Sequence, residues 1–162
     1  MGKMIKIGIA DIAVTKAPDA ITTLGLGSCI GVALFDKTTK TGGLVHIMLP
    51  DSTQIRNPGN NPSKFADTGV DELVKRMLSA GVQKRNLVAK IAGGAKMFSF
   101  SDKSTVGNVG DRNAAAVRER LKMHGIRLIA EDCGLDYGRT VELYCDTGEY
   151  HIKAVGKGKK VI

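Results

Sequence analysis

Apolar residues in the first third of the chain occur in short runs of the length of a β-strand. The runs are rich in Ile, Val and Leu and are separated by Gly, Asp, Thr and Pro: Ile5–Val14, Ile21–Leu26, Ile30–Phe35 and Leu44–Leu49. This pattern predicts that the first third is mostly β. The following stretch, Pro50–Lys64, is rich in Pro, Asn, Gly and Ser, which predicts a long loop of the kind that often carries function.

Two later segments have apolar residues at helical spacing. The first is followed by Gly81, where a left-handed residue commonly ends a helix. The second covers Val109–His124, with Asn108 as its predicted N-cap. The apolar stripes are Val70, Leu73, Val74, Met77 and Leu78 in the first helix, and Ala114, Val117 and Leu121 in the second. Each stripe is expected to face a sheet.

The remaining apolar segments predict four more strands: Asn86–Ala92, Ile126–Glu131, Val141–Cys145 and Tyr150–Val155. The last two are joined by a hairpin-like turn at Asp146–Glu149. The sequence has no repeat or linker, so we expect a single α/β domain over residues 1–155. Its predicted fold is a layered sandwich of mixed β-strands covered by two main helices. Residues 156–162 form a basic C-terminal tail that is expected to fray in solvent.

The net charge is +8, with 24 Lys and Arg against 16 Asp and Glu. This excess favours a nucleic acid, an anionic membrane surface or an acidic protein as partner. The chain has no Trp, is only 4% aromatic and contains no nucleic-acid-binding signature, so we expect no nucleic acid partner. An acidic protein surface is favoured, although the charge also fits the simpler interpretation that it maintains solubility.

No apolar run approaches the roughly 20 residues that a bilayer-spanning helix needs, so we expect no membrane insertion. The N-terminal segment alternates apolar with polar or small residues, unlike a secretory signal. The three cysteines form no C-x-x-C pair, so neither a disulfide framework nor a zinc knuckle is indicated. These features predict a cytoplasmic protein without a metal.

The stretch that ends at Cys29 has the strongest chemical signal. Gly27 and Ser28 precede the cysteine directly in a glycine-rich turn where main-chain N–H groups can converge on an oxyanion. A catalytic thiol also needs a neighbouring base. His46 lies on the next predicted strand, and a turn at residues 36–42 can fold that strand back. The sequence therefore predicts Cys29 as nucleophile and His46 as base.

Each of these two residues alone is weak evidence. A single cysteine beside an apolar strand is more often a small buried hydrophobic residue, and a lone histidine in a strand is usually structural. Their occurrence together, after a glycine-rich turn, favours a catalytic pair. His124 lies in the last turn of a helix and His151 in a late strand, while Cys133 and Cys145 have no comparable setting.

The proposed pair depends on strand register, because side chains share a face only where their positions match the pleat. A symmetric turn centred on Thr39 would set Cys29 opposite Leu49 and point His46 to the other face. The pair therefore requires an offset of one residue. With that offset, Cys29 is opposite His46 or Met48, and the imidazole lies directly or diagonally beside the thiol.

Two segments, Thr23–Cys29 and Gly43–Pro50, resemble the paired signature of the CheD family of chemoreceptor glutamine deamidases. Further similar segments cover most of the chain: Lys64–Thr68, Ala89–Phe98, Asn108–Gly110 and Ile129–Asp132. The resemblance implies a layered α/β sandwich. It also implies an active group of cysteine, histidine and threonine, which falls on Cys29, His46 and Thr23.

The resemblance further implies a substrate and partners. The substrate would be glutamine side chains of methyl-accepting chemotaxis receptors in bacteria, which are converted to glutamate with release of ammonia. The regulator would be a CheC-type phosphatase, and no cofactor would be required. The residues alone do not distinguish an amidase from a protease or a thioesterase, because all three use this thiol chemistry.

The main alternative is a binding module in which Ala95, Met97 and Phe98 dock a CheC-type phosphatase and catalysis is secondary. Apolar residues after a glycine turn more often pack under a loop, so the simpler interpretation of these three is a structural one. A weaker alternative is a nucleic-acid binder, which would show steep salt dependence of its affinity.

Overall fold

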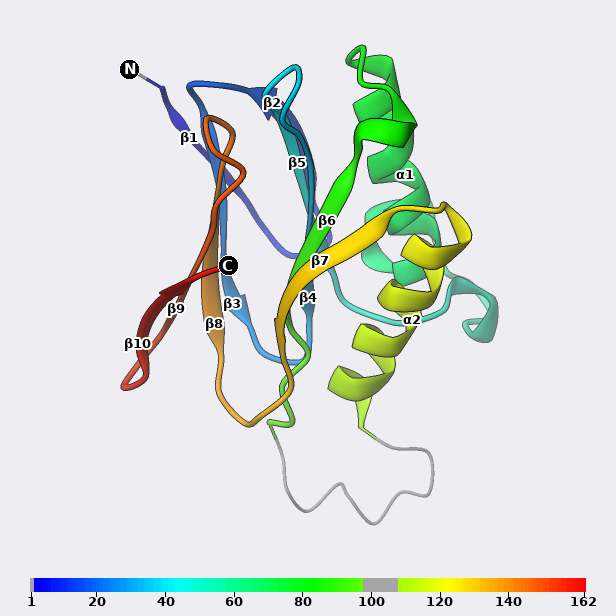
Figure 1. Cartoon of the computed structure of the whole chain (residues 1–162). Helices are drawn as coiled ribbons and strands as arrows, with labels where there is room; N and C mark the ends of the chain where they lie inside the picture. The colour runs from blue at the N-terminus through cyan, green and yellow to red at the C-terminus, as the bar shows by residue number, and fades with distance from the viewer. Residues whose placement is uncertain (1, 98–107) are drawn as a thin grey trace.

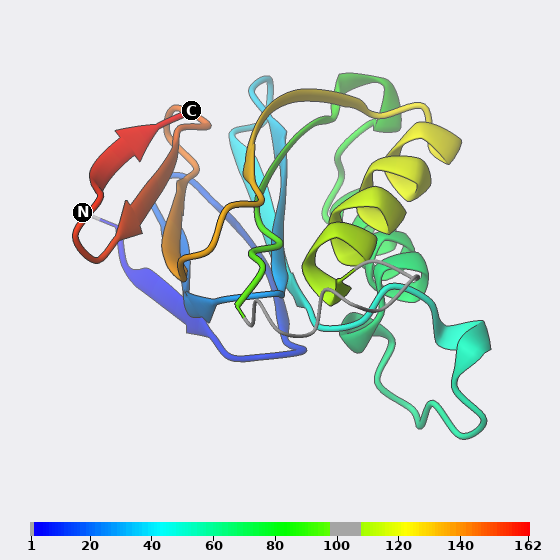
Figure 2. The ribbon, with the colours of Figure 1, turned by 90° about the horizontal axis from the view of Figure 1, so that it is seen from below.

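The computed structural model describes residues 2–97 and 108–162. Two five-stranded sheets lie face to face, and both described helices cover the outer face of one of them (Figure 1). Seen from below, the three layers follow one another as sheet, sheet and helices (Figure 2). The predicted layered α/β sandwich of mixed strands is therefore confirmed, with both helices on the same side.

Sheet A is the outer sheet, with the strand order β1-β3-β8-β9-β10. Its strands are β1 (Met4–Ile7), β3 (Ala20–Leu26), β8 (Arg139–Tyr144), β9 (Tyr150–Ala154) and β10 (Gly158–Val161). The pair β1 and β3 is parallel and the other pairs are antiparallel.

Sheet B lies between sheet A and the helices, with the strand order β2-β5-β4-β6-β7. Its strands are β2 (Ile12–Lys16), β5 (Thr41–Ile47), β4 (Ile30–Asp36), β6 (Val88–Gly93) and β7 (Arg127–Cys133). Every residue of β4 and β5 is buried, because both faces of these strands are covered.

The helices are α1 (Ala66–Ser79) and α2 (Val109–Met123), and short 3₁₀ turns lie at Ser52–Gln54, Pro62–Lys64 and Lys84–Asn86. Asn108 caps α2 as predicted, since its side chain accepts a hydrogen bond from the Asp111 N–H. Four of the five predicted stripe residues of α1 are buried. Leu78 is the exception, at 42% exposed, because it lies at the edge of the stripe.

Alternation along β4 and β5 divides the core into two parts. Val45 and Ile47 point toward the helices and belong to the helix-facing core, the apolar cluster between sheet B and the helices. Ala33 and Leu44 point the other way and belong to the inter-sheet core, the apolar cluster between the two sheets. A residue of β5 thus reaches sheet A only from every second position.

Two sequence predictions were wrong in detail. Residues 5–14 form two strands in different sheets, because the chain turns after β1 and Ala10 adopts a positive φ of 60°. The tail does not fray: β10 pairs antiparallel with β9, and Ile162 exchanges backbone hydrogen bonds of 3.0 and 3.1 Å with Tyr150. Its side chains are exposed, so backbone pairing rather than burial holds this strand.

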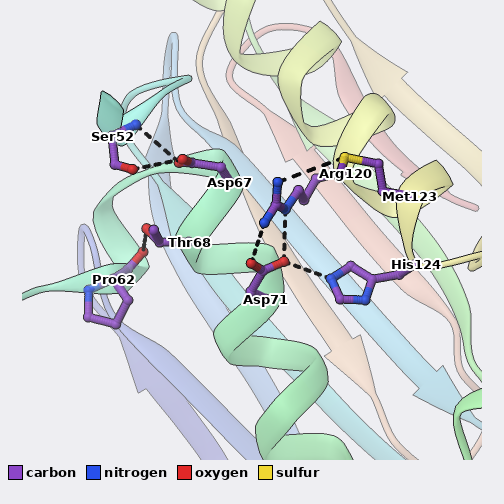
Figure 3. A network of polar contacts seen from close by, with 8 residues as sticks. All are labelled: Ser52, Pro62, Asp67, Thr68, Asp71, Arg120, Met123 and His124. Carbon is purple, nitrogen blue, oxygen red and sulfur yellow. Dashed lines mark hydrogen bonds and ion pairs between the residues drawn. The ribbon is translucent and has the colours of Figure 1, made fainter. Parts of the chain in front are cut away.

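The predicted loop at Pro50–Lys64 is fixed to α1 (Figure 3). The Ser52 N–H and hydroxyl both donate to the carboxylate of Asp67, at 3.1 and 2.7 Å. The Thr68 hydroxyl donates to the Pro62 carbonyl at 2.6 Å. These bonds hold the loop beside the end of β5, where the candidate site lies.

Candidate active site

The register of β4 and β5 has the offset that the catalytic pair requires. Gly31 is opposite His46 and Ile30 is opposite Ile47, with the turn confined to residues 37–40. Continuing this register by one residue sets Cys29 opposite Met48 and diagonal to His46. The predicted one-residue offset in register is confirmed.

The side chains of Cys29 and His46 lie on the same face of sheet B. A Cβ built on Gly31 would lie 2.6 Å from the hydroxyl oxygen of Tyr150, so position 31 and its partner His46 face sheet A. Cys29 is two residues before Gly31 and packs against the inter-sheet core. Both therefore occupy the layer between the sheets.

Thr23 reaches His46 across this layer from β3. Its hydroxyl lies 2.8 Å from Nδ1 of His46 and 2.9 Å from the carbonyl oxygen of Ile7. A carbonyl only accepts, so the single hydroxyl proton of Thr23 is donated to Ile7. The hydroxyl oxygen then accepts from the His46 Nδ1–H. This network assigns the proton to Nδ1 and leaves Nε2 as a bare acceptor.

The imidazole of His46 is fully buried, at 0% exposed. Within the described residues, Nε2 has no hydrogen-bond partner. Burial lowers the pKa of His46 from 6.5 to about 4, because desolvation disfavours the imidazolium. Near neutral pH the ring is therefore neutral, and its free lone pair is on Nε2.

Cys29 is half-buried and lines a hollow of about 320 Å³ at the end of sheet B. Met48, Met97 and the start of α2 at Val109 line the same hollow. Burial raises the pKa of the Cys29 thiol, so the resting group is a thiol rather than a thiolate. The resting pair of Cys29 and His46 is thus uncharged.

The other two cysteines differ from Cys29 in their surroundings. Cys145 is buried, and its thiol lies 3.8 Å from the Thr15 carbonyl. Burial raises the pKa of both Cys133 and Cys145 to about 11. Neither residue lines the hollow beside Cys29.

The turn before Cys29 is held through its carbonyl groups. Each of three successive carbonyls accepts one or more hydrogen bonds: Gly27 from the Ala95 N–H at 2.8 Å, Ser28 from the Asn113 side-chain amide at 2.9 Å, and Cys29 from the Gly94 N–H at 2.9 Å. The N–H of Gly27 donates to the Gly25 carbonyl at 3.0 Å within the turn itself. Gly25 has a positive φ of 70°, which glycine adopts without strain.

The three residues predicted to contact a partner have different positions. Ala95 is 1% exposed, so its side chain is packed inside. Met97 is 46% exposed and lies over the turn, since a Cβ on Gly27 would be 3.3 Å from its Cγ. Phe98 lies outside the described residues.

Sequence reasoning missed two buried polar residues near the site. Asn113 of α2 is 0% exposed and donates to the carbonyls of Ser28 and Met48, each at 2.9 Å. The sequence could have indicated that Asn113 is buried, because it lies four residues before Val117 on the apolar stripe of α2. Arg139, 1% exposed, pairs with Asp132 at 2.9 Å.

The described residues contain neither a metal-binding cluster nor a membrane-spanning helix. In residues 2–97 and 108–162, no group of three or more His, Cys, Asp or Glu side chains is arranged to hold a metal ion. In the same part of the chain, no helix has the length and apolar character needed to cross a membrane. The expectations of no metal and no cofactor remain predictions.

Comparison with known proteins identifies the family. The sequence model described as CheD chemotactic sensory transduction matches residues 48–154, more than half of the chain, beginning just after His46. A protein of Lachnoclostridium phytofermentans is 54% identical over 162 residues, and one of Syntrophomonas wolfei is 47% identical over 162 residues; each alignment covers 100% of both chains. Both are called probable chemoreceptor glutamine deamidase CheD.

Among solved structures, the hypothetical protein YfiH of Bacillus licheniformis superposes with a TM-score of 0.49 at 13% identity, covering 78% of this chain and 51% of that one. The sequence relatives, in contrast, align from end to end and include the positions of Thr23, Cys29 and His46. On this evidence, the chain belongs to the CheD family.

Proposed function

We propose that this protein is a chemoreceptor glutamine deamidase in which Cys29 is the nucleophile, His46 the general base and Thr23 the residue that orients the imidazole. The names of the full-length relatives support the activity. The observation that carries the residue roles is the hydrogen bond between Thr23 and Nδ1 of His46, because it leaves Nε2 bare on the face that Cys29 shares.

The reaction begins with transfer of the Cys29 thiol proton to Nε2 of His46. The sulfur attacks the carboxamide carbon of a receptor glutamine and forms a C–S bond, and the carbonyl oxygen takes the electron pair. The imidazolium then protonates the nitrogen, the C–N bond breaks and ammonia leaves. A water molecule attacks the thioester, His46 accepts its proton, and the carboxylate of glutamate is released as the thiol reforms.

Main-chain N–H groups of the turn stabilise the oxyanion, a contribution of about 3 kcal/mol per donor. The sequence predicted this role for Gly27 and Ser28. Since the Gly27 N–H is already donated to Gly25, the N–H groups of Ser28 and Cys29 are the better donors in this proposal. The mechanism uses only side chains and backbone of this chain, with no metal or cofactor. Because it acts on the cytoplasmic helices of receptors, the protein is proposed to be cytoplasmic.

Intact-mass analysis of a receptor fragment that contains glutamine tests this proposal. We expect a gain of about one dalton per modified site, as an amide nitrogen leaves by acyl transfer. Cys29→Ala should remove the gain, whereas Cys133→Ala should keep it. No gain with the unmodified protein would contradict the deamidase activity. An undiminished gain with Cys29→Ala would contradict the role of Cys29.

A second proposed function is docking of a CheC-type phosphatase over the hollow. Met97 supports it, because this apolar side chain is 46% exposed and lies beside Cys29 in the same hollow. An occupant at this position would cover the thiol and slow deamidation. Met97→Asp should weaken phosphatase binding, while Met123→Asp, at the far end of α2 and 65% exposed, should not. Equal binding by both variants would contradict docking at Met97.

A further inference from the structure

Asn113 is the described side chain that bridges the two backbone segments of the candidate site. It lies on α2, and its side-chain amide donates to the carbonyl of Ser28, directly before Cys29, at 2.9 Å. The same nitrogen donates to the carbonyl of Met48, two residues after His46, also at 2.9 Å. Both acceptors are carbonyls, so the orientation of the amide is fixed: its NH₂ group faces the site backbone.

The two hydrogen bonds of Asn113, which form the bridge, lie just beyond the point where the pairing of β4 with β5 ends. The last ladder pair is Ile30 with Ile47, and the next positions along the register are Cys29 and Met48. Beyond this pair the glycine-rich turn leaves the sheet, so backbone pairing no longer fixes the distance between the two segments. At this point the amide of Asn113 connects both segments to α2, so its hydrogen bonds replace the missing backbone pairing.

The bridge also sets the direction of a proposed oxyanion donor. The Ser28 carbonyl and the Cys29 N–H belong to one planar trans peptide, in which they point in opposite directions. Holding the Ser28 carbonyl toward Asn113 therefore directs the Cys29 N–H away from Asn113. The neighbouring carbonyls of Gly27 and Cys29 are held by backbone N–H groups, so this peptide is the one in the turn that a side chain orients.

A second observation separates Asn113 from an ordinary packing residue. Its Oδ1 is buried and has no hydrogen-bond partner among the described residues. A buried acceptor without a partner lowers stability, and an apolar residue at this position of the stripe would avoid that cost. Retaining the amide fits a role in which its two donated bonds serve the site.

We infer that Asn113 is a positioning residue for the reaction, which acts by holding Cys29 and its N–H in register with His46. This inference rests on the proposed function, because it concerns the same thiol. Loss of the two bonds should lower the rate of chemistry and leave substrate binding nearly unchanged, since the side chain is buried and does not line the hollow.

The test compares Asn113→Ala and Asn113→Leu with Val117→Ala, a core substitution one turn further along the buried face of α2. Rates are measured on a glutamine-containing receptor fragment and expressed per folded molecule. We expect kcat to fall about 10- to 100-fold in Asn113→Ala, with KM within about twofold. Asn113→Leu keeps nearly the same volume but has no N–H to donate, so its loss should be at least as large. Val117→Ala should lower stability with kcat kept.

Three outcomes would overturn the inference. One is a kcat of Asn113→Ala within about twofold of the unmodified protein. Another is a loss shared equally by Val117→Ala, which would indicate a general effect of α2 packing. The third is full activity of Asn113→Leu, because only side-chain volume would then matter. Cys29→Ala, measured in parallel, distinguishes this failure from that of the proposed function: if it stays active, the thiol mechanism itself is wrong.

Discussion

The two faces of sheet B differ in how deeply the polar side chains beside them are buried. On the helix-facing side, β5 contributes Val45 and Ile47 to a large apolar core, and the ion pairs between the two helices are partly exposed. Asp71 of α1 is paired there with Arg120 of α2 and with His124, the C-cap residue of α2, and all three are partly exposed (Figure 3). On the inter-sheet side, β5 carries His46 in full burial. One face of β5 thus packs in an apolar core, and the other face carries the proposed catalytic base.

The difference shows what a buried imidazole requires. Asp71 and Arg120 keep access to water, so their pairing contributes little to stability. His46 has no such access, and it needs a partner for each ring nitrogen or pays a desolvation cost. Thr23 satisfies Nδ1, while Nε2 has no partner among the described residues. In the proposed mechanism this nitrogen accepts the thiol proton of Cys29.

The largest expected effect is that of Cys29→Ala. The remaining oxyanion donors cannot replace a nucleophile, so deamidation should fall by about 10⁴-fold or more. The fold should persist, because a small side chain at the end of a strand is removed. Circular dichroism checks the fold and the receptor-fragment assay checks the rate. Turnover at a tenth of the normal rate or above would contradict a nucleophilic role.

The next effect concerns stability at acid pH. His46 has a pKa of about 4 in the folded protein, below the 6.5 of an ordinary histidine, so the unfolded chain binds a proton more readily between these values. Stability from this group is complete above pH 6.5 and is lost as pH falls toward 4, by about 3 kcal/mol.

Urea unfolding at a series of pH values measures this loss. His46→Gln should show a correspondingly shallower slope of unfolding free energy against pH, because glutamine does not titrate. Comparing the two proteins cancels the contribution of the carboxylates. Parallel curves for the two proteins would show that the imidazole is not desolvated as the structure indicates.

A smaller effect is expected at Thr23. Thr23→Val keeps the shape but removes the oxygen that accepts from Nδ1–H, so the imidazole loses its orientation and activity should fall about 10- to 100-fold. Thr23→Ser is the matched control, because it retains the hydroxyl and should keep most of the activity. If valine and serine gave the same rate, orientation by the hydroxyl would be ruled out.

The smallest effect should come from the other face. Asp71→Ala removes the ion pair between α1 and α2, which is partly exposed, and should lower stability by less than about 1 kcal/mol without changing kcat. Glu72→Ala is the control, since its partner Arg76 lies on the same helix. A large loss of activity in Asp71→Ala would show that this ion pair, and not only the inter-sheet face, takes part in the chemistry.

Much of the fold follows from local sequence pattern. The run Ile30–Phe35 and the stripe of α2 are recognisable because burial on one or two faces leaves a period in the sequence. The register of β4 with β5 could be predicted only indirectly, because the proposed catalytic pair requires an offset of one residue. The assignment of strands to two sheets was not, because pairs such as β3 with β8 join residues more than 100 positions apart.

The site could be predicted only where its residues lie close in the chain. Cys29 directly precedes β4 and His46 lies on β5, and these two strands form one hairpin. The role of Asn113 depends on α2 meeting the turn before Cys29, a contact across 85 positions. The strand β10 was missed because its pairing is a backbone property, and Lys159 and Lys160 suggest only a solvated segment. Local sequence pattern therefore predicts burial well but predicts long-range polar contacts poorly.

The pH dependence of kcat/KM shows whether the buried, neutral imidazole of His46 is the base for Cys29. On the acid side this ratio reports the base in the free enzyme. Because burial lowers the pKa of His46 to about 4, activity should persist through pH 6.5 and decline only near pH 4. An acid limb centred at 6.5, the ordinary value for a histidine in water, would contradict this role of His46.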